Sequence, residues 1–362
     1  MDTSRRAKWR RTSWFTSTVV LAALIVLLAI SLIATLGIGT VKYPFSLVYS
    51  IVADKLFSGG TGAGVTYTVA QGHVIWDVRL PRVTLGVLCG AGLAVCGAVM
   101  QAIVQNPIAD PYILGISSGS SAGAAIALLT PLPIIGGQFQ TTTAAAIGAL
   151  VSAAVVYMMA KAGGGGKLQP MTLLLSGTAV NAVMSAVTSF LIFLAKSPEG
   201  IAAVYNWQMG SLGSATATTL PLPLIGVTAG VIIFSIFGGR FNLLMMGDEY
   251  ACALGMNVKV FRAAMFIVSS IVIATLVSIT GIIGFVGLII PHIVRLLTRT
   301  SNNAIVIPYS ALIGAIYLLW ADAGARSLFG AAELPLGIIT AFIGAPFFLY
   351  LMVAKQAGGS RD

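Results

Sequence analysis

The sequence predicts an all-α polytopic membrane protein with about ten transmembrane helices. Hydrophobic residues make up 57% of the 362 residues and the mean hydropathy is +0.97, whereas charged residues contribute only 8%. Soluble domains are roughly 45–50% apolar and about 25% charged, so the composition excludes an ordinary soluble protein. The apolar residues also gather in long runs separated by polar segments, as membrane spans do.

The chain begins with a basic segment, residues 1–15, followed by an apolar run from about 16 to 38. The hydrophobic core of a signal peptide spans only about 7–15 residues, so we expect a retained first helix with a cytoplasmic N-terminus. Residues 16–354 are predicted to form a single transmembrane domain, and residues 355–362 a second cytoplasmic tail. Residues 40–82 are mixed in character and are expected outside, near the membrane surface.

Nine further apolar runs follow the first. Several are shorter than the roughly 20 residues that a perpendicular helix needs, so their boundaries are approximate. An even number of spans puts both termini in the cytoplasm, and most of the 20 Lys and Arg residues then fall in cytoplasmic segments, as the positive-inside rule requires. The formal charge of +10 is therefore interpreted as a consequence of the membrane topology and not as a sign of a nucleic-acid-binding surface. The runs cover residues 83–104, 112–129, 142–159, 171–194, 220–237, 263–279, 282–297, 305–328 and 336–353.

Residues 240–262 form a polar segment between the sixth and seventh runs, on the predicted cytoplasmic side. Asp248 and Glu249 follow Gly247, where the dipole of a first helical turn favours acidic residues, and Gly255 lies where a short helix would end. Taken alone, these residues favour an ordinary connecting loop. The alternative, a short helix that another protein could approach closely, depends on the rest of the chain.

The sequence contains no catalytic constellation and no metal-ligand spacing, so we expect no catalytic residue, metal or cofactor on this chain. Residues 161–168 resemble a phosphate loop, but the pattern requires Gly in place of Lys161 and Ser or Thr in place of Leu168. The segment is interpreted as a flexible linker, so any ATP hydrolysis would need another subunit. Asp322 and Arg326 are the ionisable residues predicted within a span, and their spacing of four residues lets them pair.

Several longer motifs occur in order along the chain. They are RLPR at 79–82, QAIVQNPIADP at 101–111, ILGISSG at 113–119, GDE at 247–249, ALG at 253–255, GIIGFVGLIIPHIVR at 281–295, ADAGAR at 321–326, ELPLGI at 333–338 and GAP at 344–346. Together they resemble the permease family that imports iron-siderophore complexes, haem and cobalamin. The resemblance implies a type II ABC importer with two ten-helix permease subunits, identical or related, a cytoplasmic ATPase dimer and an external substrate-binding protein.

The resemblance also implies three groups of functional residues. Contact with the ATPase would be made by Gly247, Asp248, Glu249, Ala251, Leu254 and Gly255. Acidic residues of the binding protein would dock on Arg79, Arg82 and Arg326. The translocation path and its gate would include Asn106, Ile108, Pro170 and Met171 on the cytoplasmic side, and Trp207 and Met209 at the outward mouth. Without the resemblance, interfacial anchoring would be the favoured interpretation of Arg79 and Arg82.

The leading functional interpretation is ATP-driven import of a metal chelate, such as a ferric siderophore, haem or cobalamin, across a bacterial plasma membrane. ATP and Mg²⁺ would bind to the partner ATPase. The alternative is an ATP-independent secondary transporter or channel. A membrane-embedded enzyme is disfavoured because acidic residues and histidines are sparse. The sequence leaves open which chelate is carried and whether the second permease subunit is identical.

Overall fold

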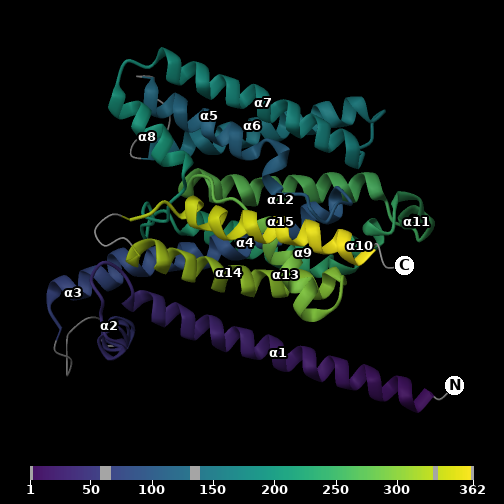
Figure 1. Cartoon of the computed structure of the whole chain (residues 1–362), viewed down its shortest axis with the longest axis horizontal. Helices are drawn as coiled ribbons and strands as arrows, with labels where there is room; N and C mark the ends of the chain where they lie inside the picture. Colours follow the sequence, from purple (N-terminus) through teal and green to yellow (C-terminus); the bar gives the residue numbers. More distant parts are fainter. Residues whose placement is uncertain (1–2, 58–66, 131–138, 329–332, 360–362) are drawn as a thin grey trace.

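The computed structural model describes residues 3–57, 67–130, 139–328 and 333–359, with side chains described between residues 19 and 350 of these ranges. All regular secondary structure in this part of the chain is helical. Figure 1 shows most of the helices lying along one common direction, with both chain ends at the same end of the bundle as α11. The helices of the first half are α1 (Thr3–Gly37), α2 (Phe45–Phe57), α3 (Val69–His73), a π-helix (Val74–Arg79), α4 (Leu80–Ile103), a 3₁₀ turn (Pro111–Leu114), α5 (Ile116–Leu129), α6 (Gln140–Gly163) and α7 (Pro170–Leu194).

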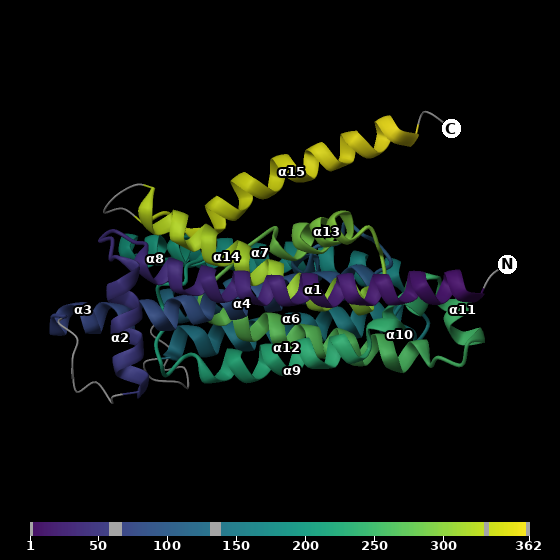
Figure 2. The same cartoon turned by 90° about the horizontal axis from the view of Figure 1, so that it is seen from below.

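The second half continues with shorter and more interrupted helices. They are α8 (Pro198–Gln208), α9 (Pro221–Ile236), α10 (Gly238–Met245), α11 (Asp248–Ala253), α12 (Val258–Thr280), α13 (Val286–Thr298), α14 (Asn303–Ser327) and α15 (Leu336–Gly359). In space, α5 to α8 form a group on one side of α12, whereas α1 lies on the opposite side of the bundle against α14 (Figure 1). Helix α15 diverges from the bundle toward its C-terminal end (Figure 2).

The prediction of about ten spans agrees with the structure. Six described helices are long and apolar enough to cross a membrane, and α9 with α10 forms a further span bent by 62°. Three shorter apolar helices, α5, α13 and the first part of α15, complete the set. Each of these segments overlaps one of the ten apolar runs seen in the sequence, so hydropathy alone located them all.

The helix that contains the second apolar run begins before that run. One continuous helical segment runs from Val69 to Ile103, so the last part of the segment that was expected outside the membrane, residues 69–82, is helical. Hydropathy did not reveal these first turns because they carry charged residues. The fold supplies partners for these charges, since His73 lies 2.8 Å from Asp77 and Arg79 bonds to the backbone carbonyl oxygens of Leu36 and Val41. Helix α1 also extends beyond its apolar run. It begins at Thr3 and continues without a break through the basic segment into the first span.

Small residues bring neighbouring helices into backbone contact. A Cβ atom added at Gly119 of α5 would lie 2.5 Å from the Gly148 carbonyl oxygen of α6, and one at Gly123 would lie 2.1 Å from that of Ala144. Tight packing of this kind is how membrane helices associate when lipid supplies no hydrophobic drive. This packing holds α5 against α6 and so determines which face of α5 contacts α7.

Candidate functional site

The segment between α10 and α12 has the helical form that the glycine and acid spacing suggested. Gly247 has a φ of 109° and precedes α11, and Gly255, with a φ of 82°, follows it. Glycine adopts such backbone angles without the steric penalty that a side chain would bring. Asn257 then caps α12 by accepting a hydrogen bond from the Val260 amide. The result is a one-turn helix set apart from the bundle at the end where the chain termini lie (Figure 1).

The outer face of this segment is apolar. Met246, Tyr250 and Leu254 are spaced four residues apart and are 59%, 65% and 63% exposed, whereas Ala251 is fully buried against the bundle. Glu249 is exposed beside them. Because residues four apart on one helix share a face, Tyr250 and Leu254 form an apolar stripe along α11, whereas Met246 lies before the break at Gly247. Exposed apolar surface framed by polar residues is typical of a protein contact.

Asp248, in contrast, is engaged inside the chain. The guanidinium of Arg262 on α12, only 2% exposed, donates to both carboxylate oxygens of Asp248 at 2.8 and 2.6 Å. Gln105 donates a further hydrogen bond to the same carboxylate at 2.8 Å. The hydrogen bond from Arg262 is the main reason that the pKa of Asp248 lies below its ordinary value. The ion pair therefore ties α11 to the first turns of α12.

The same cluster reaches both segments that were predicted to form the cytoplasmic gate. Arg262 also donates to the Leu168 carbonyl oxygen at 2.8 Å, two residues before Pro170 and three before Met171. Gln105 also donates to the Leu244 carbonyl oxygen at 2.7 Å and immediately precedes Asn106. We call Asp248, Arg262, Gln105 and Leu168 the cytoplasmic cluster, after the side of the membrane on which the sequence predicts them to lie.

The predicted gate residues themselves lie at two chain turns. Asn106 and Ile108 follow the end of α4, where the Asn106 side chain accepts a hydrogen bond from the Ile108 amide at 3.1 Å. Pro170 and Met171 begin α7. Ile108 is 49% exposed and Met171 is 65% exposed. Both turns are thus accessible and are adjacent in sequence to members of the cytoplasmic cluster.

At the opposite end of the bundle, the three predicted docking arginines come together but are buried. Arg82 bonds to Asp322 at 3.0 Å and to Glu333 at 2.8 Å, and Arg326 pairs with Asp322 at 2.9 Å. The predicted pairing of Asp322 with Arg326 is therefore confirmed. Arg79 donates to the carbonyl oxygens of Leu36 and Val41, and Arg326 to those of Thr35 and Ile38. Each guanidinium already has partners within the chain, so docking on them stays a prediction.

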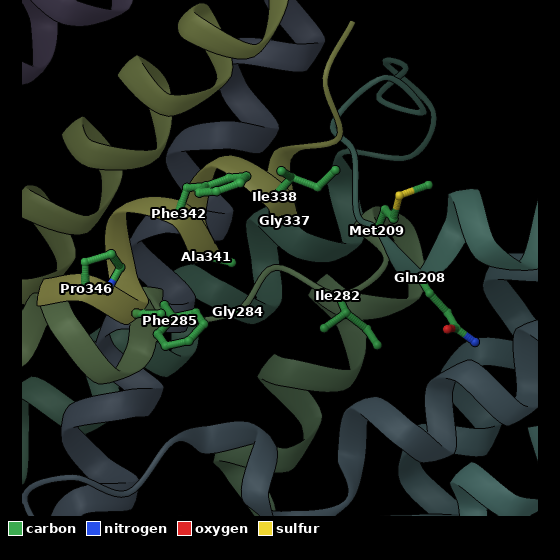
Figure 3. A pocket seen from close by; sticks show the side chains of 11 residues that line it. Gln208, Met209, Ile282, Gly284, Phe285, Gly337, Ile338, Ala341, Phe342 and Pro346 are labelled. Atoms are coloured by element: carbon green, nitrogen blue, oxygen red, sulfur yellow. The ribbon is translucent and has the colours of Figure 1, made fainter. Parts of the chain in front are cut away.

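The predicted mouth residues lie at the end of α8, where three segments meet. The Met209 carbonyl oxygen accepts a hydrogen bond from the Gly337 amide at 3.0 Å, and Gly210 accepts one from Leu336 at 2.9 Å. Trp207 is half-buried and Met209 lines a cavity of about 600 Å³ that opens between α15 and the rest of the bundle (Figure 3). The cavity is largely apolar. Its lining includes Gln208, Met209, Ile282, Phe285, Ile338 and Phe342.

Within the described residues, no group of three or more His, Cys, Asp or Glu side chains is placed to hold a metal ion. Cys89 and Cys96 are buried in α4, and Cys252 of α11 is exposed. Sequence reasoning missed Arg262 and Gln105, because nothing in their local spacing signals a partner 14 or 143 residues away.

Comparisons with known proteins give one consistent picture. The cobalamin import system permease protein BtuC of Halobacterium salinarum is 42% identical over 78% of this chain and 74% of its own length. The hemin transport system permease protein HmuU of Yersinia pestis is 32% identical over 93% of this chain and 96% of its own length. A solved metal-chelate-type ABC transporter in an inward-facing conformation superposes with a TM-score of 0.78 at 31% identity, covering 92% of this chain and 99% of that one. The model of the FecCD transport family matches residues 24–354, and the chain belongs to that family as the transmembrane permease subunit of an ABC importer.

Proposed function

We propose that this chain is the membrane-spanning subunit of an ATP-driven importer that passes a metal chelate from an external binding protein to the cytoplasm. The chelate would be a ferric siderophore, haem or cobalamin. The protein would lie in a bacterial plasma membrane with both termini in the cytoplasm. It would work beside a second permease subunit, and a cytoplasmic ATPase dimer would bind ATP and Mg²⁺ and drive the cycle.

The observation that carries the proposal is the relation between the apolar stripe and the cytoplasmic cluster. The stripe offers Tyr250 and Leu254 to a partner on the side where the chain ends lie. Two residues before Tyr250, Asp248 is bonded to Gln105, which precedes Asn106, and to Arg262, which bonds to Leu168 just before Pro170. A push on α11 would therefore be transmitted by short hydrogen bonds instead of by a flexible loop.

This arrangement divides the work between the two neighbouring acids. Glu249 and the stripe would contact the ATPase, and Asp248 would connect that contact to the gate. Rigid elements joined by charged hydrogen bonds can transmit a displacement between two arrangements, whereas a solvated loop would absorb it. The absence of a phosphate loop at residues 161–168 is consistent with the nucleotide being hydrolysed by a partner.

The test is reconstitution of the complete complex in vesicles, with the binding protein loaded in turn with cyanocobalamin, haemin or a ferric hydroxamate. We expect uptake that requires ATP, Mg²⁺ and the ATPase, and that persists when ion gradients are collapsed. Uptake that follows a proton or sodium gradient in the absence of the ATPase would instead establish a secondary transporter and overturn the proposal.

A further inference from the structure

A second cavity, of about 270 Å³, lies among α5, α7, α8 and the turn between α12 and α13. It adjoins the apolar cavity of Figure 3, because Gln208 and Ile282 line both. We call it the hydroxyl cavity. Its lining residues are Ser117, Ser118, Ser121, Asn181, Ser185, Thr188, Ser189, Ile192, Tyr205, Gln208 and Ile282.

The lining is polar but carries no charge. Nine of these eleven residues bear a hydroxyl or carboxamide group, in a chain that is 57% hydrophobic. Asn181, Ser185 and Ser189 follow one another at intervals of four along α7, and Ser117 and Ser121 do the same on α5. Residues four apart share a helix face, so two polar faces meet across the cavity.

Several of these groups are not satisfied by the chain itself. Ser118 and Thr188 bond back to carbonyl oxygens of their own segments, Gly115 and Met184, at 3.0 Å each. In the part of the chain that the structure describes, the side chains of Ser117, Ser121, Asn181 and Ser185 have no such partner. Ser117 and Ser121 are 8% and 5% exposed, whereas Asn181 and Ser185 are exposed. These four side chains open onto the cavity, where their polar groups are available to hydrogen-bond water or a ligand.

The position of the cavity places it on the proposed path. Its α7 residues follow the predicted gate residue Met171 on the same helix, and Ser185 lies 14 residues further along, roughly 21 Å at the helical rise. At the other side, Gln208 ends α8 between the predicted mouth residues Trp207 and Met209. The hydroxyl cavity therefore lies between the predicted mouth and the predicted gate, a placement that rests on the proposed function.

We propose that the hydroxyl cavity is a binding station for one part of the chelate during translocation, and that it favours a chelate without net charge whose surface bears amide, hydroxyl or hydroxamate groups. Hydroxyls and carboxamides both donate and accept hydrogen bonds, so they match such a surface in many orientations. The neighbouring apolar cavity accommodates an apolar part of the same ligand against Phe285 and Phe342.

Because the lining of the hydroxyl cavity carries no charged side chain, the station disfavours charged chelates. A chelate with free carboxylates would lose its hydration without gaining a cation, and an unpaired buried charge is far more costly than an unpaired hydroxyl. Individual neutral hydrogen bonds are weak enough to exchange, which lets the ligand leave. The station selects by hydrogen bonding and shape and does not hold the chelate tightly.

The first part of the test compares four probes in the reconstituted wild-type complex: cyanocobalamin, a neutral ferric trihydroxamate, haemin and ferric citrate. We expect ATP-dependent uptake of one or both neutral probes and at least tenfold slower uptake of the two anionic ones. Uptake of an anionic probe in preference to the neutral pair would overturn the assigned ligand class. If none of the four is taken up with ATP, the proposed function fails, and the inference falls with it.

The second part uses matched double variants of α7. Asn181→Leu with Ser185→Ala removes two groups from the cavity, and Val183→Ala with Val187→Ala changes the opposite face of the same helix; all four residues are exposed, so the two pairs are matched in accessibility. We expect the first pair to slow uptake of the transported probe about tenfold while basal ATPase activity and complex assembly stay unchanged. The valine pair should leave uptake within twofold of wild type. Unchanged uptake in the first pair, or equal loss in both pairs, would overturn the binding station while leaving ATP-driven import intact.

The third part reports occupancy directly. In a Cys252→Ser background the remaining cysteines, Cys89 and Cys96, are buried, so a cysteine introduced by Ser185→Cys can be labelled alone. A small hydrophilic maleimide should modify it in the assembled complex, and the transported probe, delivered by the binding protein, should slow that labelling at least threefold. Labelling that is absent, or that the probe leaves unchanged, would contradict a ligand-accessible cavity.

Discussion

The carboxylate of Asp248 and the guanidinium of Arg262 form a two-bond ion pair, with donor–acceptor distances of 2.8 and 2.6 Å, at the point where the exposed helix α11 meets α12. The two partners differ in environment. The Arg262 side chain is 2% exposed, whereas that of Asp248 is 42% exposed. Loss of the acid would therefore leave a buried cation without its counter-charge, which makes Asp248 a structural connection and leaves Glu249 as the accessible acid.

Asp248→Asn should destabilise the protein and uncouple chelate uptake from ATP hydrolysis. The free energy of unfolding should fall by about 1–3 kcal/mol, because hydrogen bonds to a charged group are lost and Arg262 stays buried. ATP hydrolysis should continue while chelate uptake per ATP falls. The measurements are thermal unfolding in detergent and the ratio of uptake to hydrolysis in vesicles. Glu249→Gln is the matched control, and equal effects of the two substitutions on unfolding would contradict the internal role of Asp248.

The contribution of this ion pair should depend on pH in one direction. Arg262 holds the pKa of Asp248 below its ordinary value of 3.8, so the folded state favours the ionised carboxylate. That stabilisation is present above the ordinary pKa and is lost as pH falls through the lowered one. The unfolding midpoints of wild type and Asp248→Asn should therefore differ at pH 7 and converge below about pH 4. If the two midpoints differ by the same amount at pH 7 and well below pH 4, the difference has a cause other than the ion pair.

Tyr250→Ala combined with Leu254→Ala should weaken attachment of the ATPase at least tenfold without affecting folding. Both side chains are mostly exposed, so their removal leaves no cavity, while a partner would lose two central apolar contacts. Co-purification and the measured dissociation constant in mild detergent provide the readout. Leu297→Ala, at an exposed leucine in the last turn of α13, is the control and should bind normally. Normal binding by the double variant would remove the stripe from the contact.

The docking prediction can be tested through Glu333, because its carboxylate already pairs with Arg82 and would compete with an acidic residue of the binding protein. Arg82 is buried beside Asp322 and Glu333, so Arg82→Gln is chosen because it adds no third carboxylate there; it should slow docking of the binding protein and spare ATPase attachment. Glu333→Gln should have the opposite effect, since the half-exposed Glu333 carboxylate occupies an Arg82 nitrogen at 2.8 Å. Association rates measured at two salt concentrations would separate the variants. If Glu333→Gln slows docking or leaves it unchanged, Arg82 does not accept an acid from the partner.

Local patterns accounted for much of the fold. The ten apolar runs and the pairing of Asp322 with Arg326 four residues apart follow from hydropathy or spacing within a few turns, whereas the spacing around Gly247 left both a loop and a short helix open. Hydropathy did not reveal the helical turns before residue 83, because charged side chains lower hydropathy even where the fold supplies their partners. Arg82 in these turns pairs with Asp322, 240 residues away, which no window of sequence can detect.

By itself the sequence determined the membrane class and the approximate number and order of the spans, because these depend on composition and short-range spacing. The tertiary structure decided which acid beside Gly247 is accessible, where the three arginines direct their guanidinium groups and which hydroxyls face a cavity. The physical reason is that a side chain's partner across a bundle depends on how helices pack. That packing brings Gln105, Leu168, Asp248 and Arg262 together from four separate segments.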